Sequence, residues 1–254
     1  MNRIFDLSQP VVFAHRGASR FAPENTLAAF QKAVNCGAPA IELDAKLTSD
    51  GQIVVMHDMT VNRTTNGKGA VRAMSLAALQ ELDAGGWFSP LYQKERIPTL
   101  EEVLQAFGKK LYINIELTNY ASTDDALPEM AVELVQRMGL LDEVIFSSFV
   151  AKNLERIRAA APEAMLGYLY PSGLMGWLAT NLGGRRLLPQ AAHPNAGMVN
   201  QKFIERQHAL NRRVHAWTVN DREQMENLFK QGVDGIFTDD PALALQARSE
   251  SLNP

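Results

Sequence analysis

The sequence predicts an α/β protein built as a closed (β/α)₈ TIM barrel, with a small insertion after the second strand. Short apolar, β-branched segments alternate with longer helical patterns along the whole chain, which is typical of parallel βαβ units. Eight such segments can be counted, and 254 residues is an ordinary length for a single barrel domain. An open, doubly wound sheet is the alternative arrangement of the same elements.

The first strand is predicted at 11–14, where four apolar residues follow a proline. A helix is predicted next, at about 25–36, with Asn25 as its N-cap and Gly37 as its stop. Apolar residues at helical spacing within this segment provide a face that can be buried against the strands.

The remaining elements repeat this order to the end of the chain. The further strands are predicted at about 39–47, 111–116, 143–147, 165–169, 189–193, 212–217 and 235–238. The clearest helices between them are predicted at 127–138, 150–160, 199–209 and 221–231. The last residues, 249–254, are expected to form a frayed tail.

Turn-forming sequences interrupt this alternation over about 58–98. The segment contains glycine-rich turns at 66–69 and 85–87, and one short helical pattern near 75–82. We interpret it as an insertion without a core of its own, so that 1–254 forms a single barrel domain.

The composition excludes several classes of protein. The 28 acidic and 25 basic residues leave a formal net charge of −3, which argues against nucleic acid as the main partner but permits a small anion in a local basic pocket. A single cysteine, Cys36, excludes an internal disulfide and fits a reducing compartment. We find neither a secretory signal nor an apolar run long enough to span a membrane. We therefore expect a cytoplasmic protein without a stable membrane anchor.

Carboxylates gather where the second and third strands end, and the active site of a (β/α)₈ barrel lies at the carboxyl ends of its strands. Because side chains alternate between the two faces of a strand, Glu42, Asp44 and Lys46 share one face of the second strand. The two carboxylates are about 7 Å apart along it, and Glu116 on the next strand completes a set of three. Such oxygen ligands suit Mg²⁺ or Ca²⁺ rather than Zn²⁺, although a Glu-x-Asp pair alone is also common at a solvated strand end.

A hairpin is predicted to return the chain along the second strand. If a two-residue turn is centred on Asp50-Gly51, the register places His57 opposite Asp44. A slip of one residue would turn this histidine to the other face. A lone histidine after a strand is usually structural, but His57 beside a carboxylate pair is a candidate for proton transfer.

A second candidate histidine directly follows the first strand, in His15-Arg16-Gly17. His15 can move protons near neutral pH, and Arg16 offers a planar fork for a phosphate or carboxylate. Gly17 allows a ligand or a neighbouring backbone to come close. A salt bridge between Arg16 and Glu24 is the alternative role for this arginine, and both roles are compatible.

The other histidines have less specific expectations. His193 ends a predicted strand and could line the pocket, but structural packing is favoured. His208 and His215 are expected to be packing or surface residues. The basic run at 183–186 is expected to be a solvated loop.

The polar motifs occur in an order that resembles one known family. They are His15-Arg16-Gly17, Pro23-Glu24-Asn25-Thr26, Glu42-Leu43-Asp44, Asp50-Gly51 with His57-Asp58, Asn114-Ile115-Glu116, His215-Ala216-Trp217-Thr218-Val219-Asn220 and Gly232-Val233-Asp234-Gly235-Ile236-Phe237-Thr238-Asp239. This ordered set resembles the glycerophosphodiester phosphodiesterase family over nearly the whole chain, including the insertion.

The resemblance implies a barrel enzyme that uses a divalent metal, Mg²⁺ or Ca²⁺. Such an enzyme hydrolyses glycerophosphodiesters, for example glycerophosphocholine or glycerophosphoethanolamine, to glycerol 3-phosphate and an alcohol. By the same resemblance, His15 and His57 are the acid/base pair, while Arg16 and Trp217 bind the substrate. The implied metal ligands are Glu42, Asp44 and Glu116.

This chain departs from the family pattern at Thr118. Many members carry a lysine two residues after the third metal ligand, where it would help neutralise the phosphate. The threonine is expected to weaken transition-state stabilisation, unless another cation supplies the charge. Lys46, on the carboxylate face of the second strand, is the candidate.

Three alternative functions remain open from the sequence. The first is a lysophospholipase D, whose acyl chain would need an apolar groove that Met59, Phe88, Leu91 and Tyr92 could line. The second is a metal-dependent sugar isomerase, although such sites usually need more carboxylates. The third is a non-catalytic phosphodiester-binding relative, suggested by Thr118 but opposed by the complete set of histidines and carboxylates.

Overall fold

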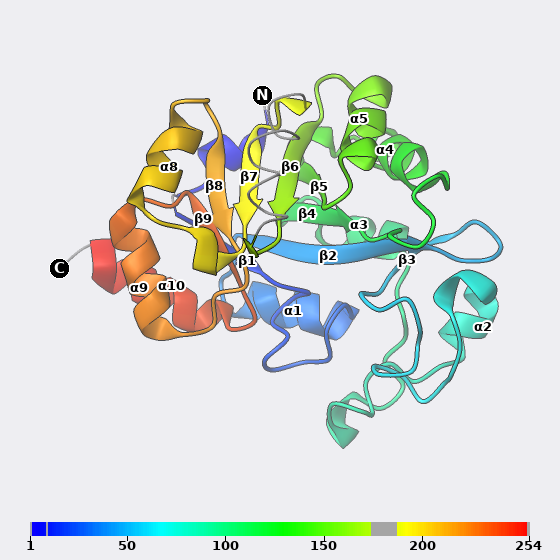
Figure 1. Cartoon of the computed structure of the whole chain (residues 1–254). Helices are drawn as coiled ribbons and strands as arrows, with labels where there is room; N and C mark the ends of the chain where they lie inside the picture. Colours follow the sequence, from blue (N-terminus) through cyan, green and yellow to red (C-terminus); the bar gives the residue numbers. More distant parts are fainter. Residues whose placement is uncertain (1, 9, 174–186, 253–254) are drawn as a thin grey trace.

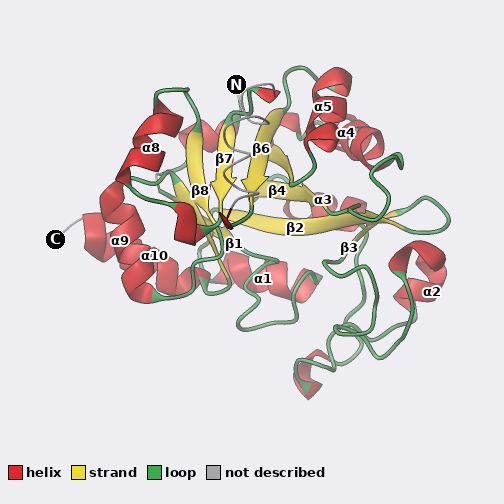
Figure 2. Ribbon diagram, viewed as in Figure 1, coloured by secondary structure: helices red, strands yellow, loops and turns green. Residues whose placement is uncertain are grey.

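Eight parallel strands form a closed barrel with helices around its outside (Figures 1 and 2). The computed structural model describes residues 2–8, 10–173 and 187–252. Successive strands pair in parallel, and the first strand pairs with both the second and the last, which closes the barrel. The strands are β1 (Val11–Ala14), β2 (Ala40–Leu47), β4 (Tyr112–Leu117), β5 (Val144–Ser148), β6 (Met165–Tyr170), β7 (Ala191–Pro194), β8 (Arg213–Ala216) and β9 (Gly235–Thr238). The predicted fold is confirmed, and each of the eight predicted strands lies within two residues of an observed one.

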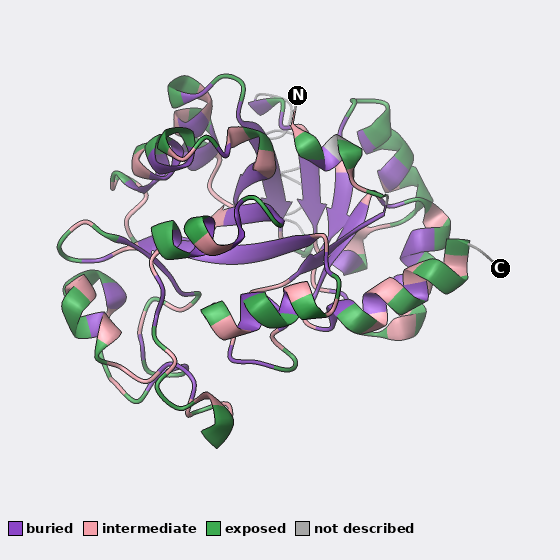
Figure 3. Ribbon diagram, turned by 180° about the vertical axis from the view of Figure 1, so that it is seen from behind, coloured by how far each residue is buried: buried purple, intermediate pink, exposed green. Residues whose placement is uncertain are grey.

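Helices connect the strands and present their exposed faces to solvent (Figure 3). They are α1 (Leu27–Asn35), α2 (Leu76–Gln80), α3 (Leu100–Phe107), α4 (Leu127–Arg137), α5 (Ala151–Ala160), α8 (Gln201–His208), α9 (Arg222–Gln231) and α10 (Pro241–Leu252). In the ranges that the structure describes, no helix has the length and apolar character needed to cross a bilayer. The solvated loop predicted at 183–186 lies outside the described residues.

In the described part of the chain, α3 and α10 are helices that the sequence did not predict, and α10 corrects the expected tail. α3 begins at a capping box, in which the Thr99 side chain accepts from the Glu102 amide and the Glu102 carboxylate accepts from the Thr99 amide. α10 continues to Leu252, so the prediction of a frayed tail was wrong for 249–252. Buried residues of α10, such as Ala244 and Ala247, pack into an apolar cluster with α9 and hold this end of the chain.

The first helix starts one residue later than predicted. Thr26, not Asn25, is its N-cap, and the Thr26 hydroxyl accepts from the amide of Ala29 at 3.2 Å. Asn25 adopts a left-handed backbone with φ 58° and turns its side chain toward β2. Gly37, with φ 79°, follows the helix and confirms the predicted stop.

The barrel strands are buried on both faces, which explains their nearly continuous apolar sequences (Figure 3). One apolar cluster fills the barrel interior and includes Phe13, Tyr112 and Phe237. A larger cluster lies between the strands and helices α1, α3, α4 and α5. This packing makes the barrel a rigid frame for the residues at its rim.

The predicted hairpin forms, but its register differs by one residue from the prediction. β3 (Ile53–Val55) pairs antiparallel to the end of β2, with Leu47 opposite Ile53. The loop contains three residues, with Gly51 at φ 75°, whereas a two-residue turn had been assumed. As a result Met56, not His57, lies opposite Asp44, and the Met56 amide donates to the Asp44 carbonyl at 2.8 Å.

The insertion packs on a small apolar core that it shares with the hairpin. It runs beyond β3 to the start of α3 and extends past the barrel (Figure 1). It contains the 3₁₀ helices η2 (Val71–Ala73) and η3 (Pro90–Tyr92) and the predicted helical segment α2. Its core consists of the buried residues Val54, Met56, Val61, Val71, Leu79, Ala84 and Ile97. Because Val54 and Met56 belong to the hairpin, this core joins the insertion to the barrel.

Candidate active site

A cavity of about 110 Å³ opens at the carboxyl ends of the barrel strands. It is lined by His15, Arg16, Glu42, His57, Asn114, Glu116, Phe149, Leu169, Trp217, Thr218 and Phe237. Six of the seven predicted site residues are therefore brought to one cavity from β1, β2, β4, β8 and the hairpin. The seventh, Asp44, lies directly behind them and is only 1% exposed.

The three predicted metal ligands form one cluster. Asp44 and Glu116 are neighbours in the β2–β4 register, and Glu42 lies two residues before Asp44. One carboxylate oxygen from each of the three lies within 4.8 Å of the others. Glu42 Oε1 is buried and accepts no hydrogen bond, which is costly for a carboxylate oxygen unless a cation is bound there. This donor set fits a hard divalent cation.

The surroundings raise the pKa of two of the three carboxylates and lower the pKa of the third. Burial, with the nearby charge of Asp44, raises the pKa of Glu116 to about 7 and raises the pKa of Glu42 well above its usual range. Burial also acts against the charge of Asp44, but Arg16, His57 and a hydrogen bond from Asn25 lower its pKa. A cation that binds here would compete with protons for the two glutamates.

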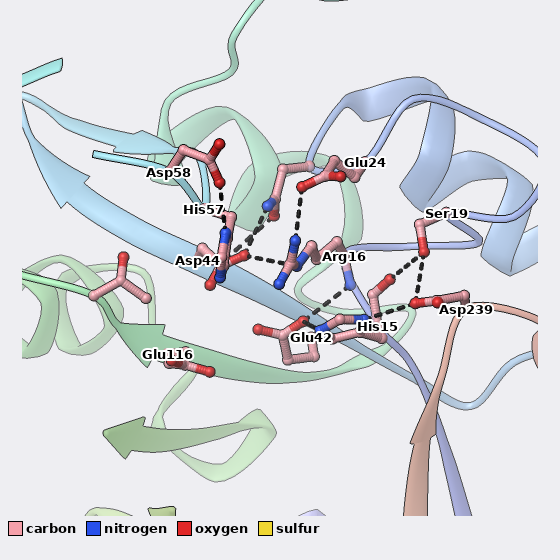
Figure 4. A network of polar contacts seen from close by, with 12 residues as sticks. His15, Arg16, Ser19, Glu24, Glu42, Asp44, His57, Asp58, Glu116 and Asp239 are labelled. Atoms are coloured by element: carbon pink, nitrogen blue, oxygen red, sulfur yellow. Dashed lines mark hydrogen bonds and ion pairs between the residues drawn. The ribbon is translucent and has the colours of Figure 1, made fainter. Parts of the chain in front are cut away.

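Arg16 is fixed above this cluster by its backbone and its side chain (Figure 4). Its amide donates to Glu42 Oε2 at 2.9 Å, and its Nη1 donates to Glu24 Oε1 at 2.8 Å. Its Nε lies 3.3 Å from Asp44 Oδ2. Although burial alone lowers the pKa of this guanidinium, the surrounding carboxylates hold it above its usual value. The predicted salt bridge to Glu24 is confirmed.

Gly17 allows this loop to pack tightly against the first helix. Its φ is 83°, and a Cβ at this position would lie 2.6 Å from the backbone carbon of Ala29. The predicted close approach is therefore made by a neighbouring backbone.

His15 is oriented by a carboxylate at the end of β9 (Figure 4). Its Nδ1 lies 2.7 Å from Asp239 Oδ1, and its Nε2 lies 4.0 Å from Glu42 Oε2. Ser19 Oγ and Asn220 Nδ2 also donate to Asp239. Burial opposes the charge of Asp239, but these hydrogen bonds lower its pKa to about 2. Asp239 thus stays ionised and holds one ring nitrogen of His15.

His57 is oriented in the same way by its sequence neighbour. Its Nδ1 lies 2.7 Å from Asp58 Oδ1. The register places Met56 opposite Asp44, yet His57 still lines the cavity, because pairing with β2 ends before it and the chain turns. In each of the two histidines, an aspartate carboxylate bonds Nδ1, so that Nε2 can contact a ligand.

Apolar and aromatic side chains form the opposite wall of the cavity. Trp217 Nε1 donates to the carbonyl of His193 at 2.7 Å, and its ring meets Phe149 edge to face, with the centroids 5.4 Å apart.

His208 and His215 are packing or surface residues, as predicted. His215 is fully buried with His193, while His208 lies near the surface with its Nε2 2.7 Å from Asp234.

Lys46, the candidate for the charge that is missing at position 118, bonds Thr118 directly, and both residues line a cavity beside the active-site cavity. Its Nζ donates to the Thr118 carbonyl at 2.9 Å and to the Thr118 hydroxyl at 2.6 Å. Burial lowers the pKa of Lys46, and the charges of Asp44, Glu116 and Asp58 act in the opposite direction. A buried ammonium thus lies over Thr118 and close to the carboxylate cluster.

Some residues that shape the site were not singled out from the sequence. Asn25 Nδ2 donates to Asp44 Oδ2 at 2.8 Å, and the Tyr120 hydroxyl donates to Glu116 Oε1. Arg63 bonds both Glu24 and Asp58. Asp239 and Asn25 do belong to the sequence motifs, but the sequence assigned neither of them a role in the site. The others lie in loops, where no periodic pattern indicates which side chains meet.

The apolar residues considered for an acyl-chain groove do not line the active-site cavity. Phe88 packs edge to face against Trp87 and Tyr92 within the insertion. Leu91 is 91% exposed, and Met59 lines a separate cavity beside Lys46. The geometry thus gives no support to the lysophospholipid alternative.

Comparison with known proteins identifies the family. A sequence model described as the Glycerophosphoryl diester phosphodiesterase family matches residues 15–243. A glycerophosphodiester phosphodiesterase from Caldanaerobacter subterraneus subsp. tengcongensis is 39% identical over 232 residues, which cover 91% of this chain and 94% of that protein. A glycerophosphodiester phosphodiesterase from Bacillus altitudinis is 35% identical over 244 residues, covering 94% and 98%.

Solved structures agree with the sequence relatives. The structure of a phosphodiesterase from Oleispira antarctica, in complex with the product sn-glycerol-3-phosphate, is similar with a TM-score of 0.84 at 32% identity, covering 95% of this chain and 97% of that one. A glycerophosphodiester phosphodiesterase from Agrobacterium tumefaciens gives a TM-score of 0.82 at 29% identity, covering 93% and 99%. The chain therefore belongs to the glycerophosphoryl diester phosphodiesterase family and is an enzyme of that activity.

Proposed function

We propose that this enzyme is a divalent-metal-dependent phosphodiesterase that converts glycerophosphodiesters, such as glycerophosphocholine or glycerophosphoethanolamine, to glycerol 3-phosphate and an alcohol. One observation carries the proposal. A cluster of three carboxylates, with a buried oxygen that has no partner, shares a cavity with two aspartate-bonded histidines and an arginine. The Oleispira antarctica relative was solved with glycerol 3-phosphate, which supports a small glycerophosphate ligand here as well.

Glu42, Asp44 and Glu116 are the residues that would hold the metal. When bound, Mg²⁺ or Ca²⁺ offsets the negative charge that grows on the phosphoryl oxygens during attack. Arg16 would bind the phosphate as well, because Glu24 fixes its guanidinium at the edge of the same cavity.

His15 and His57 would share the two proton transfers of the reaction. Asp239 and Asp58 occupy the Nδ1 atoms, so each Nε2 is available for the substrate. One histidine removes a proton from the attacking oxygen as its bond to phosphorus forms. The other donates a proton to the alcohol oxygen as its bond to phosphorus breaks.

The attacking oxygen belongs to water or to the neighbouring hydroxyl of the substrate's glycerol, and the intermediate distinguishes these routes. Attack by the hydroxyl expels the alcohol and forms a cyclic phosphate, which water must then open to give glycerol 3-phosphate. Phosphorus NMR detects the cyclic phosphate if it accumulates. Trp217, Phe149 and Phe237 would pack against the carbon atoms of the glycerol at the apolar wall.

Release of glycerol 3-phosphate from glycerophosphocholine tests the proposal. We expect EDTA to abolish turnover, and Mg²⁺ or Ca²⁺ to restore it. The variant Glu116→Gln should weaken metal affinity in calorimetry more than it lowers thermal stability. Glu129→Gln on α4, whose carboxylate bonds Arg156 far from the cavity, is the matched control and should leave metal affinity unchanged. Full activity in excess chelator would contradict the proposal.

A further inference from the structure

We propose that Arg63, in the insertion, is a positioning residue that fixes Arg16 and His57 relative to each other. The inference rests on the proposed function of these two residues in phosphate binding and proton transfer. Arg63 does not line the active-site cavity, so any effect on the reaction must pass through its partners.

Arg63 holds two carboxylates at once, each through two hydrogen bonds. Nη1 and Nη2 donate to the two oxygens of Glu24 at 2.7 and 2.9 Å. Nε and Nη2 donate to the two oxygens of Asp58, both at 2.9 Å. Four donations from one planar group leave little freedom for either carboxylate, and only a guanidinium has this geometry.

Each of these carboxylates holds one residue of the site with an oxygen that Arg63 also binds. Glu24 Oε1 accepts from Arg16 Nη1 at 2.8 Å, and Asp58 Oδ1 lies 2.7 Å from His57 Nδ1. In the view of Figure 4, Glu24 and Asp58 lie beyond Arg16 and His57, on the side away from Glu42 and Glu116. A continuous chain of hydrogen bonds therefore joins the predicted phosphate-binding residue to a predicted proton-transfer residue.

The carboxylates of Glu24 and Asp58 require a positively charged group between them. Glu24 precedes α1 and Asp58 follows β3, so two loops bring two carboxylates to one guanidinium. Hydrogen bonds from Arg63 lower the pKa of Asp58 against the effect of burial. Burial likewise opposes the charge of Glu24, and the contacts with Arg63 and Arg16 lower its pKa. Without Arg63 the two carboxylates would repel each other, and each would lose two of the hydrogen bonds that hold it in place.

The insertion thereby gains a role in the chemistry. The barrel fixes the backbone of Arg16 through the amide hydrogen bond to Glu42, whereas the Arg16 guanidinium is held by Glu24. His57 and Asp58 lie beyond the last paired residue of β3. Arg63 ties these two loops together across the rim.

The test compares Arg63→Ala and Arg63→Lys with the matched pair Arg222→Ala and Arg222→Lys. Arg222 is also partly exposed and also bonds two carboxylates, Glu226 and Glu250, but it lies on α9. We expect Arg63→Ala to lower kcat/KM about 10–100-fold, as is typical when the partner of a functional side chain is removed. Arg63→Lys keeps the charge but loses the fork, so it should recover only part of this loss. Both Arg222 variants should leave kcat and KM unchanged.

Two further variants then test the contacts through Glu24 and through Asp58 separately. Through Arg16, Glu24→Gln should mainly raise KM and the dissociation constant of glycerol 3-phosphate. Through His57, Asp58→Asn should mainly lower kcat and shift the ring ¹⁵N signals of His57. Arg63→Ala should show both effects, and adding Asp58→Asn to it should lower kcat no further than the worse single variant.

Two readouts do not depend on turnover. The ring signals of His57 and the affinity for glycerol 3-phosphate are measured by NMR and calorimetry, with His57→Gln assigning the signals. If glycerophosphocholine is not hydrolysed by the unchanged enzyme, the proposed function fails, while these two measurements still decide the role of Arg63. Normal ring signals and normal product affinity in Arg63→Ala would overturn the inference. A loss of thermal stability alone would overturn it as well.

Discussion

The two histidines of the site are built on different parts of the molecule. His15 and Asp239 follow the paired strands β1 and β9, and the His15 amide donates to the Thr238 carbonyl at 2.8 Å. His57 and Asp58 lie in the insertion beyond the last paired residue of β3. The His15 side chain is 20% exposed and that of His57 is 41% exposed. A histidine–aspartate pair is thus held by strand pairing on the barrel and by ion pairs between loops on the insertion.

The difference affects how much each histidine depends on its surroundings. Asp239 receives hydrogen bonds from Ser19 and Asn220 in addition to His15, so the loss of one donor leaves others. Asp58 is held through Arg63, a longer side chain that is 44% exposed. We therefore expect the barrel pair to tolerate the loss of one donor to Asp239 better than the insertion pair tolerates the loss of Arg63, the donor to Asp58.

The largest effect should follow from removing either histidine itself. His15→Ala and His57→Ala should each lower kcat about 10²–10⁴-fold, the usual contribution of a positioned proton-transfer group. If both act in one step, the double variant should be little worse than the poorer single variant. Steady-state kinetics on glycerophosphocholine measures this.

The leaving group then separates the two roles. p-Nitrophenolate departs without a proton, so the variant without the general acid should recover most of its activity on a p-nitrophenyl phosphodiester. The variant without the base should not recover. Wild-type rates for both variants on the natural substrate would show that the histidines are structural.

The orienting aspartates should produce the next largest effect. Asp239→Asn and Asp58→Asn should each lower kcat about 10–100-fold, because the ring loses its preferred tautomer and orientation. We expect the larger loss for Asp239→Asn, since water can more easily replace the partner of the more exposed His57. Equal losses would mean that exposure does not distinguish the two regions.

Lys46 tests whether the barrel also supplies the positive charge that the family pattern places at position 118. Lys46→Ala should raise KM about 10-fold, in the lower part of the range for a charge-assisted contact. Thr118→Lys alone should be neutral or harmful, because the Lys46 ammonium already lies over this position. The double variant Lys46→Ala, Thr118→Lys should recover the lost affinity. If neither single substitution changes the kinetics, neither residue carries the missing charge.

The smallest expected effect is a dependence of stability on pH and metal. In the metal-free protein the pKa of Glu116 is about 7, above its ordinary value of 4.5. The folded protein therefore keeps a proton that the unfolded chain releases, and this group lowers the free energy of unfolding as the pH rises from about 4.5 to 7. Bound Mg²⁺ or Ca²⁺ replaces that proton, so its stabilising effect should be larger at pH 8 than at pH 5.5. Thermal unfolding with and without metal at both values measures this, and Glu116→Gln should reduce the difference.

The sequence was most informative where the backbone is periodic. Alternating apolar segments located all eight barrel strands, and their carboxyl ends marked the rim where His15, Glu42 and Glu116 line one cavity. Strand periodicity also placed Glu42 and Asp44 on one face, and the structure brings both into the carboxylate cluster. These predictions were confirmed because a barrel strand is buried on both faces and must therefore be apolar over most of its length.

The predictions that failed concern turns and loops. The hairpin register depended on whether the loop has two or three residues, and the extra residue placed Met56 instead of His57 opposite Asp44. The first N-cap was assigned to Asn25, whose side chain instead bonds Asp44. In both cases several local conformations suit the same residues, and contacts distant in sequence select one of them.

The sequence by itself thus determined the barrel, its order of strands and the residue types at its rim. Only the tertiary structure decided which partners these residues have: Asp239 for His15, Lys46 over Thr118, and Arg63 between Glu24 and Asp58. The physical reason is the range of the interactions involved. Burial of apolar faces requires apolar residues at a regular spacing, which can be read along the sequence. Hydrogen bonds and ion pairs join side chains from different loops, and loops have no such regular spacing.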